Sequence, residues 1–195
     1  PVLAAAGDPF FLVAHSYGAA VALRVALANP NRVRGMVLYE PTLFSLIDTV
    51  SAPPNAADGI RHAVQAAGQA LDAGDPALAA EHFIDYWMGP RAWEKTPEPR
   101  KAPIAASVVN VRRWAHALFT EPSALAAFRT LDMPIVYMQG KATTPSALGV
   151  ARLLTGVLPR VEVVEFDGLG HMGPVTHPHV VNPVIARFLD QQTVG

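Results

Sequence analysis

The sequence predicts an α/β fold: a mostly parallel sheet, helices on both faces of that sheet, and a helical insertion. Several short, mostly apolar runs have the composition of strands, and helical patterns separate them along the chain. A serine stands in a tight turn between the first such run and the helix that follows. Residues 42–129 lack the alternation of strands, so we expect this long stretch to be helical.

The composition indicates a globular protein without a strongly charged partner. The chain has 195 residues, of which 51% are hydrophobic, enough for one domain with a substantial core. A formal net charge of -1 argues against nucleic acid or an anionic membrane as a partner. No apolar run approaches a membrane span and no signal peptide is visible, so we expect a soluble, cytoplasmic protein. The lack of Cys excludes disulfides and thiolate chemistry.

The first strand and helix enclose a serine. Phe10–Val13 is an apolar run typical of a buried strand, and Val21–Ala28 is rich in good helix formers. Ser16 lies in the turn between them, and small residues, Ala14 and Gly18, stand two positions to either side. We expect small residues there because larger side chains would collide with backbone in a sharp turn. The turn would expose the Ser16 hydroxyl beside the free N–H groups of the helix.

This segment resembles the nucleophile elbow of the alpha/beta-hydrolase family, whose pattern is Gly-x-Ser-x-Gly, with Ala14 in place of the first Gly. The resemblance implies that Ser16 is a nucleophile and that the backbone N–H of Tyr17 is one oxyanion-hole donor. Residues 1–6 look like the end of a helix capped by Gly7. The resemblance then implies a fragment that lacks the family's first strands and the second oxyanion donor, with an unpaired apolar edge at Phe10–Val13.

A carboxylate follows the second strand. Val33–Tyr39 is mostly apolar and ends at Glu40, so parallel pairing would bring Glu40 to the same sheet edge as Ser16. The alternative is a solvated loop residue or an ion-pair partner. The run from Asn31 to Glu40 is similar to a branch of the haloalkane dehalogenases that carries its acid here. Those enzymes have an Asp nucleophile, so we do not expect dehalogenation.

The long insertion resembles the helical cap of the family. We expect a core at residues 1–41 and 130–195 and a cap at residues 42–129. Within the cap the pattern predicts a loop over residues 89–103 and four helices: Ala56–Leu71, Ala77–Met88, Ile104–Phe119 and a short one at Glu121–Thr130. Its large apolar residues would mostly pack together, and a few would line an apolar pocket: Phe44, Phe83, Trp87, Met88, Trp93, Trp114 and Phe119.

In many hydrolases an Asp follows the strand that corresponds to Met133–Gly140, but no carboxylate stands at residues 141–145 of this sequence. Asp132 stands at the opposite end of this strand. Thr143 or Thr144 could hydrogen-bond a histidine, but a hydroxyl supplies no charge. Glu40 is therefore the best candidate for the acid of a catalytic triad.

The last strand, Val161–Phe166, alternates as a half-exposed edge strand does, and a loop containing His171 follows it. Gly168 and Gly170 permit a tight turn that would bring His171 to the sheet edge. The loop and the helix after it, residues 180–189, resemble the family's catalytic histidine loop. The alternative is a histidine that only packs on the cap.

The other polar residues near these segments receive simpler interpretations. His177 and His179 match no zinc-ligand spacing with His171, so we predict no metal and no cofactor. His15 is expected to pack or hydrogen-bond behind the elbow. Asp167 is expected to form a turn rather than to act as an acid.

The resemblance implies a serine hydrolase that cleaves an ester or a similar acyl bond of a small, largely apolar molecule. His171 would take the Ser16 proton, and Glu40 would orient the imidazole ring. One alternative is a ligand-binding member of the same fold that turns over slowly or not at all. Another is different chemistry on the same residues, such as carbon–carbon bond hydrolysis or cofactor-free perhydrolysis. The sequence leaves open whether the chain forms a homo-oligomer.

Overall fold

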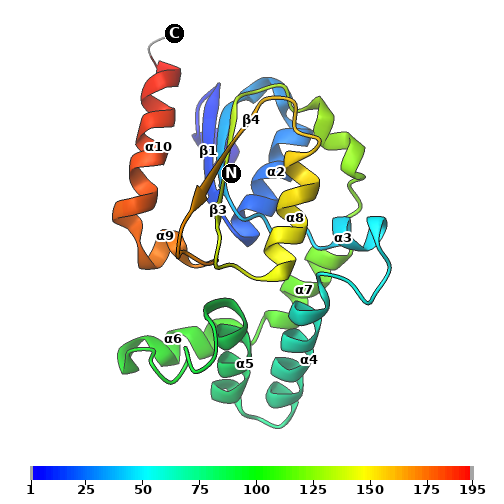
Figure 1. The fold of residues 1–195 in the computed structure, drawn as a ribbon, viewed down its shortest axis with the longest axis vertical. Helices are drawn as coiled ribbons and strands as arrows, with labels where there is room; N and C mark the ends of the chain where they lie inside the picture. The colour runs from blue at the N-terminus through cyan, green and yellow to red at the C-terminus, as the bar shows by residue number, and fades with distance from the viewer. Residues whose placement is uncertain (1, 194–195) are drawn as a thin grey trace.

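A computed structural model describes residues 2–193 and contains a parallel four-stranded sheet in the order β1-β2-β3-β4 (Figure 1). The strands are β1 (Phe10–His15), β2 (Val33–Tyr39), β3 (Ile135–Gly140) and β4 (Val161–Phe166). Because neighbouring strands are parallel, all four carboxyl ends lie at one edge of the sheet. The predicted fold class and the four predicted strands are confirmed.

Helices cover both faces of the sheet: α2 (Tyr17–Ala28) and α8 (Pro145–Thr155) on one, α10 (Pro178–Thr193) on the other (Figure 1). Successive residues of β2 alternate between two cores. Met36 and Leu38 pack in the core that includes α2 and α8, whereas Val37 and Tyr39 pack in the core that includes α10. A strand buried on both faces needs apolar side chains at every position, which explains the nearly continuous apolar run.

The two outer strands differ in exposure. Within residues 2–193, β1 pairs only with β2, as expected for an edge strand, and Val13 is 49% exposed. At the other edge β4 is half-exposed, as its sequence predicts, but its exposure does not strictly alternate, since Glu162 and Val163 are both exposed. The predicted helix end before β1 is α1 (Val2–Ala5), and Gly7 follows it with φ of 81°. Pro1 lies outside the described residues.

The segment between β2 and β3 is helical, as predicted, and gathers mainly beyond the carboxyl edge of the sheet (Figure 1). Its elements are α3 (Ser45–Val50), α4 (Asp58–Asp72), α5 (Pro76–Met88), α6 (Glu98–Val108), α7 (Val111–Phe119) and the 3-10 helix η2 (Leu125–Thr130). Helices α4 to α7 share a small core of their own, which contains Trp93, Val108 and Val111. Two further short elements lie among the described residues, η1 (Pro30–Arg32) and α9 (Gly173–Thr176).

Three predictions about this segment are wrong. The loop predicted over residues 89–103 ends earlier, because α6 begins at Glu98 and accepts Pro99 in its first turn, where an N–H would have no helical acceptor. The helix predicted over Ile104–Phe119 is broken between Val108 and Val111 into α6 and α7. The helix predicted over Glu121–Thr130 begins only at Leu125, as the 3-10 helix η2, since Pro122 disfavours helical geometry at the residue before it.

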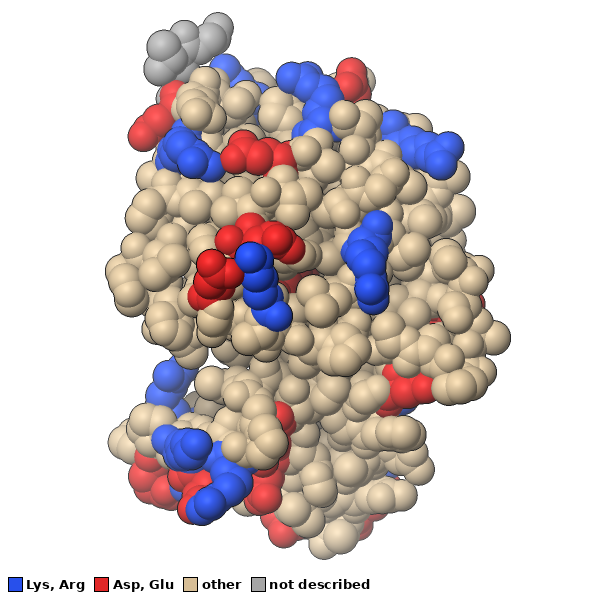
Figure 2. All heavy atoms as spheres, viewed as in Figure 1, with Lys and Arg blue, Asp and Glu red and all other residues tan. Residues whose placement is uncertain are grey.

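Charged side chains of both signs are interspersed on the face that Figure 2 shows, without a large patch of either sign. Among the helices within residues 2–193, none combines the length and the apolar character that crossing a bilayer requires.

Candidate active site

Ser16 occupies a strained turn between β1 and α2. Its backbone has φ of 57° and ψ of -123°, a left-handed conformation that non-glycine residues rarely adopt. The Ser16 N–H donates to the Tyr39 carbonyl at 2.9 Å, which ties the turn to the end of β2. Strain of this kind costs about 1–3 kcal/mol and is typical of functional positions.

Helix α2 begins directly after Ser16, earlier than the sequence predicted. Tyr17 is its first residue, so the Tyr17 N–H has no acceptor within the helix and is free to bind a ligand oxygen. Gly18 lies in the first turn of α2. A Cβ added there would meet no atom within 4 Å among the described residues beyond its chain neighbours and the adjacent backbone of that helix.

Glu40 is fully buried at the end of β2, with φ of 44°. One carboxylate oxygen, Oε1, accepts from the Gly140 N–H at 2.8 Å. The other, Oε2, accepts from the Thr143 hydroxyl at 2.7 Å and lies 2.7 Å from His171 Nδ1. These bonds satisfy a buried negative charge that would otherwise be strongly unfavourable. The alternative interpretation of Glu40 as a solvated loop residue is wrong.

The loop after β4 approaches β3 closely enough that only glycine fits. A Cβ on Gly140 would lie 2.1 Å from the Leu169 carbonyl oxygen, and Leu169 accepts from the Ala142 N–H at 2.9 Å. Gly168 has φ of 71°, as a tight turn requires. This packing brings His171, which is 1% exposed, over the sheet edge.

The three predicted residues form a continuous hydrogen-bonded relay. His171 Nε2 lies 2.8 Å from Ser16 Oγ, while His171 Nδ1 lies 2.7 Å from Glu40 Oε2. Because an ionised carboxylate only accepts, Nδ1 donates to Glu40 and Nε2 accepts from the Ser16 hydroxyl. An imidazole in this tautomer can remove the hydroxyl proton.

Two further side chains, His15 and Tyr39, donate hydrogen bonds to backbone carbonyls of the His171 loop. Burial, and then the neighbouring His171, lower the pKa of His15 from 6.5 to about 4, so its ring is neutral near pH 7. His15 Nε2 donates to the His171 carbonyl at 2.8 Å, as expected for a residue behind the elbow. Burial, and then the charge of Glu40, raise the pKa of Tyr39 well above its usual value. The protonated phenol donates to the Gly170 carbonyl at 2.8 Å.

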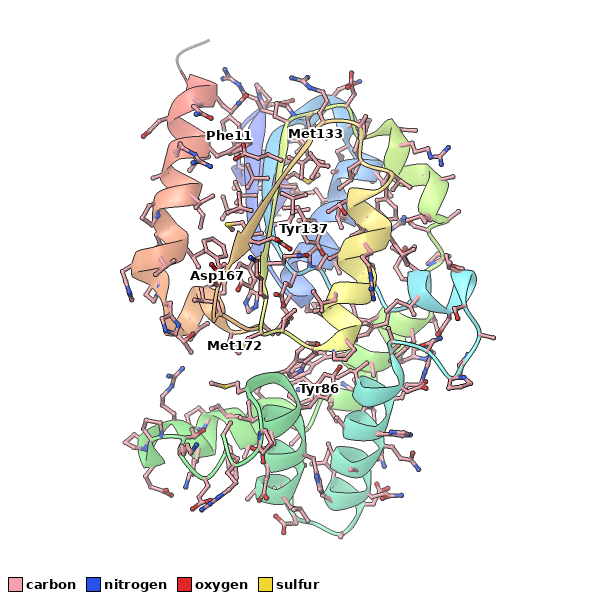
Figure 3. The ribbon with its side chains drawn as sticks, in the orientation of Figure 1. Phe11, Tyr86, Met133, Tyr137, Asp167 and Met172 are labelled. Atoms are coloured by element: carbon pink, nitrogen blue, oxygen red, sulfur yellow. The ribbon has the colours of Figure 1, made fainter. Side chains whose placement is uncertain are left out.

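A cavity of about 330 Å³ opens onto Ser16 and His171. Its remaining wall is almost entirely apolar and comes mainly from the helical segment. Of the apolar residues considered in the sequence, four line this cavity: Phe44, Phe83, Trp87 and Trp114. An apolar cavity with few polar groups is typical of a small-molecule site. Figure 3 labels Tyr86 and Met172, which lie where the helical segment meets the strand ends.

Some expectations about neighbouring residues need correction. Thr143 bonds Glu40 rather than the histidine, and Thr144 caps α8 by accepting from the Ala147 N–H. Asp167, labelled in Figure 3, lies in the turn after β4, as expected, and its exposed side chain pairs with Lys141 at 2.9 Å, away from the relay. Trp87 stacks on His171 with ring centroids 3.9 Å apart. This contact was not predicted, because local sequence patterns do not reveal contacts between residues that are far apart along the chain.

No metal site is evident in the described part of the chain, where no three His, Asp or Glu side chains gather as ligands would. The rings of His177 and His179 lie 6.0 Å apart.

Residues 2–184 match the Alpha/beta hydrolase family. The chain belongs to the alpha/beta hydrolase family. Among curated proteins, this hydrolase is similar to Lipase LipV of Mycobacterium tuberculosis, with 31% identity over 199 residues. That match covers 94% of this chain and 70% of the lipase.

Solved structures with lower sequence identity share the fold of this alpha/beta hydrolase. The epoxide hydrolase CorEH superposes with a TM-score of 0.76 at 20% identity, covering 97% of this chain and 71% of that one. The esterase RhEst1 from Rhodococcus superposes with a TM-score of 0.73 at 20% identity, covering 97% and 68%. An esterase from Thermogutta terrifontis gives 0.69 at 19% identity, covering 95% and 66%.

Proposed function

We propose that this alpha/beta hydrolase cleaves a carboxylic ester, or a similar acyl bond, of a small and largely apolar molecule. Ser16 is the nucleophile, His171 the general base and acid, and Glu40 the group that orients the imidazole. The observation that carries the proposal is the relay from Ser16 Oγ to His171 to Glu40, with bonds of 2.8 and 2.7 Å. The likeness to a lipase at 31% identity supports the same reaction class.

In the acylation step Ser16 Oγ attacks the ester carbonyl carbon while His171 Nε2 takes the hydroxyl proton. The carbonyl oxygen becomes an oxyanion, and the backbone N–H of Tyr17 donates to it. His171 then gives its proton to the leaving alkoxide, which departs as an alcohol. Ser16 is left as an acyl ester.

In the deacylation step His171 removes a proton from water, and the resulting hydroxide attacks the acyl carbon. The tetrahedral intermediate collapses, and His171 returns the proton to Ser16 Oγ. Glu40 stays ionised and stabilises the imidazolium in both steps. The buried bonds from Gly140 and Thr143 keep its carboxylate in place during this cycle.

The cavity supports an apolar substrate of modest size. Its volume of about 330 Å³ and its aromatic wall fit a short acyl or aryl group better than a charged one. In this proposal residues 42–129 form a cap over a core made of residues 1–41 and 130–195. The cap excludes water from the acyl group and selects substrates by the shape of the cavity.

A hydrolysis assay tests the proposal with p-nitrophenyl esters of acetate, butanoate and octanoate. We expect turnover by the wild-type protein and a loss of about 10⁴-fold or more in Ser16→Ala. Ser45→Ala is a control for the loss of a serine hydroxyl elsewhere, because Ser45 is buried and does not line the cavity. Equal activity of Ser16→Ala and wild type would contradict the proposal. Binding of these esters without any turnover would favour a ligand-binding member of the fold.

A further inference from the structure

His171 has an aromatic partner in addition to its two hydrogen bonds. The indole of Trp87 stacks on the imidazole with ring centroids 3.9 Å apart and an interplanar angle of 25°. Trp87 is 8% exposed and His171 is 1% exposed, so water has little access to this contact. Trp87 comes from α5 in the helical segment, whereas Ser16 and Glu40 belong to the sheet edge.

We propose that Trp87 is a positioning residue for the hydrolytic reaction and acts through His171. The inference rests on the proposed function, because it concerns the change in charge that His171 undergoes during acyl transfer. It adds to the relay a residue supplied by the helical segment.

The first part of the argument is electrostatic. His171 is neutral before the reaction and becomes an imidazolium when it accepts the Ser16 proton. The face of an indole ring carries negative potential and attracts a cation, more strongly where water is excluded. The stack therefore stabilises the protonated ring more than the neutral one. An interaction that strengthens on the way to the transition state raises kcat.

The second part of the argument is geometric. His171 must direct Nδ1 to Glu40 and Nε2 to Ser16 at the same time, which fixes one orientation of the ring. A flat indole packed against one face opposes rotation out of that orientation. Small departures from a reactive geometry can cost large factors in rate.

Trp87 is itself held by neighbouring aromatic rings. Its ring stacks near Phe44 at 6.4 Å and meets Phe83 edge-to-face at 6.3 Å and Tyr86 edge-to-face at 4.9 Å. The indole is therefore supported on several sides and is not free to leave His171 without repacking this cluster.

The end of α5 is also anchored to the core of the fold. The Tyr86 hydroxyl and the Ser146 hydroxyl, on α8, are 2.6 Å apart. Asp85 accepts from the N–H groups of Arg91 and Trp93, which fixes the chain that follows α5. The adjacent residues Tyr86 and Trp87 thus join the helical segment to α8 and to His171. Correct seating of the segment becomes a requirement for full activity.

Trp114 provides a control for a role in cavity shape alone. It lines the same cavity, and its aromatic contact is with Phe83. Trp87→Leu and Trp114→Leu remove the same kind of surface from one cavity. Only the first removes the stack on His171.

The experiment measures kcat and KM with p-nitrophenyl butanoate, and the single-turnover rate at which a fluorophosphonate labels Ser16. We expect Trp87→Leu to lower kcat and the labelling rate about 30-fold, the factor that corresponds to a desolvated cation–π contact of about 2 kcal/mol. Trp87→Phe keeps an aromatic face on His171, so we expect it to retain most of the wild-type kcat and labelling rate. Trp114→Leu changes KM more than kcat.

A double-mutant cycle decides whether Trp87 acts through His171. In a His171→Ala background we expect Trp87→Leu to have no further effect on the labelling rate. The inference would be overturned if Trp87→Leu lowered the labelling rate by the same factor with and without His171, or if it left kcat unchanged.

Thermal unfolding of each variant shows whether it is folded. If Trp87→Leu does not fold, the same cycle with Trp87→Phe decides the question. Because a phenyl ring attracts a cation more weakly than an indole, we expect Trp87→Phe to lower the labelling rate about two- to threefold. If this decrease vanishes in the His171→Ala background, it supports the inference; if it persists there, it opposes the inference. A wild-type protein that neither hydrolyses the ester nor reacts at Ser16 overturns the proposed function as well. Wild-type reactivity that Trp87 variants leave intact overturns only the inference.

Discussion

The sheet edge and the helical segment support the same candidate site in different ways. At the sheet edge, Glu40 and His171 are hydrogen-bonded to each other. Glu40 makes two further bonds to the backbone of β3, one with the Gly140 N–H and one with the Met138 carbonyl. The helical segment contributes packing instead, with aromatic side chains against the cavity and a stack on His171. The function of a hydrogen-bonded site depends on distances of tenths of an ångström. The packed wall of a cavity can be altered with a smaller loss of activity. Substitutions at the edge should therefore affect chemistry. Substitutions in the segment should affect mainly substrate choice, except at Trp87, which stacks on His171.

After Ser16→Ala, the largest effect is expected for Glu40→Gln. The neutral amide cannot stabilise the imidazolium, and its N–H₂ group would face donors from Gly140, Thr143 or His171. We expect kcat to fall by about 10³- to 10⁴-fold, with KM changing little. Steady-state kinetics with p-nitrophenyl butanoate measures both values. An unchanged kcat would remove Glu40 from the mechanism.

Gly140→Ala should produce the next largest loss. The added Cβ would lie 2.1 Å from the Leu169 carbonyl oxygen, so the loop carrying His171 must move. We expect kcat to fall about 100-fold, as displacement of a catalytic group by about 1 Å does. Gly156→Ala is a control away from the site, at the end of α8. An added Cβ there would lie 3.1 Å from the Arg152 carbonyl oxygen, a contact that a shift of a few tenths of an ångström relieves. Full activity of Gly140→Ala would show that the loop is not seated as described.

Two adjacent threonines allow a finer test. Thr143→Val removes one bond to the buried carboxylate of Glu40, and we expect kcat to fall about tenfold. Thr144→Val removes the cap of α8, and we expect a loss of about 1 kcal/mol in the free energy of unfolding with kcat largely kept. Kinetics and urea unfolding of both variants separate the two effects. The same kinetic loss in both variants would oppose separate roles.

Titration of His15 should make the fold less stable in acid. The folded-state pKa of His15, about 4, lies below the value of 6.5 expected in the unfolded chain. Between these pH values the unfolded chain binds more protons, so the stability contributed by neutral His15 is complete above about pH 6.5 and is lost as the pH falls toward 4. This contribution is about 1–3 kcal/mol.

His15→Gln tests this linkage, because the amide N–H can still donate to the His171 carbonyl but does not titrate. We expect urea unfolding to show a shallower loss of stability between about pH 6.5 and pH 4 in this variant than in wild type. Identical slopes for the two proteins would mean that His15 does not account for the acid sensitivity.

The difference between the sheet edge and the helical segment also explains which features could be predicted from the sequence. Ser16, Glu40 and His171 each follow a strand, and parallel strands bring their carboxyl ends to one edge, so their proximity follows from chain order. The partner of Glu40 at Thr143 was missed, because it depends on how one loop folds after β3. The Pro-containing start of α6 and the contact between Trp87 and His171 depend on helix packing, about which local patterns say little.

The most direct test of the central claim is the site of reaction with a fluorophosphonate ester. Peptide mass spectrometry should find the phosphonyl group on Ser16 in the wild-type protein, with labelling slowed strongly in both His171→Ala and Glu40→Gln. Labelling of another residue, or labelling of Ser16 at the same rate in all three proteins, would contradict the relay on which the account is built.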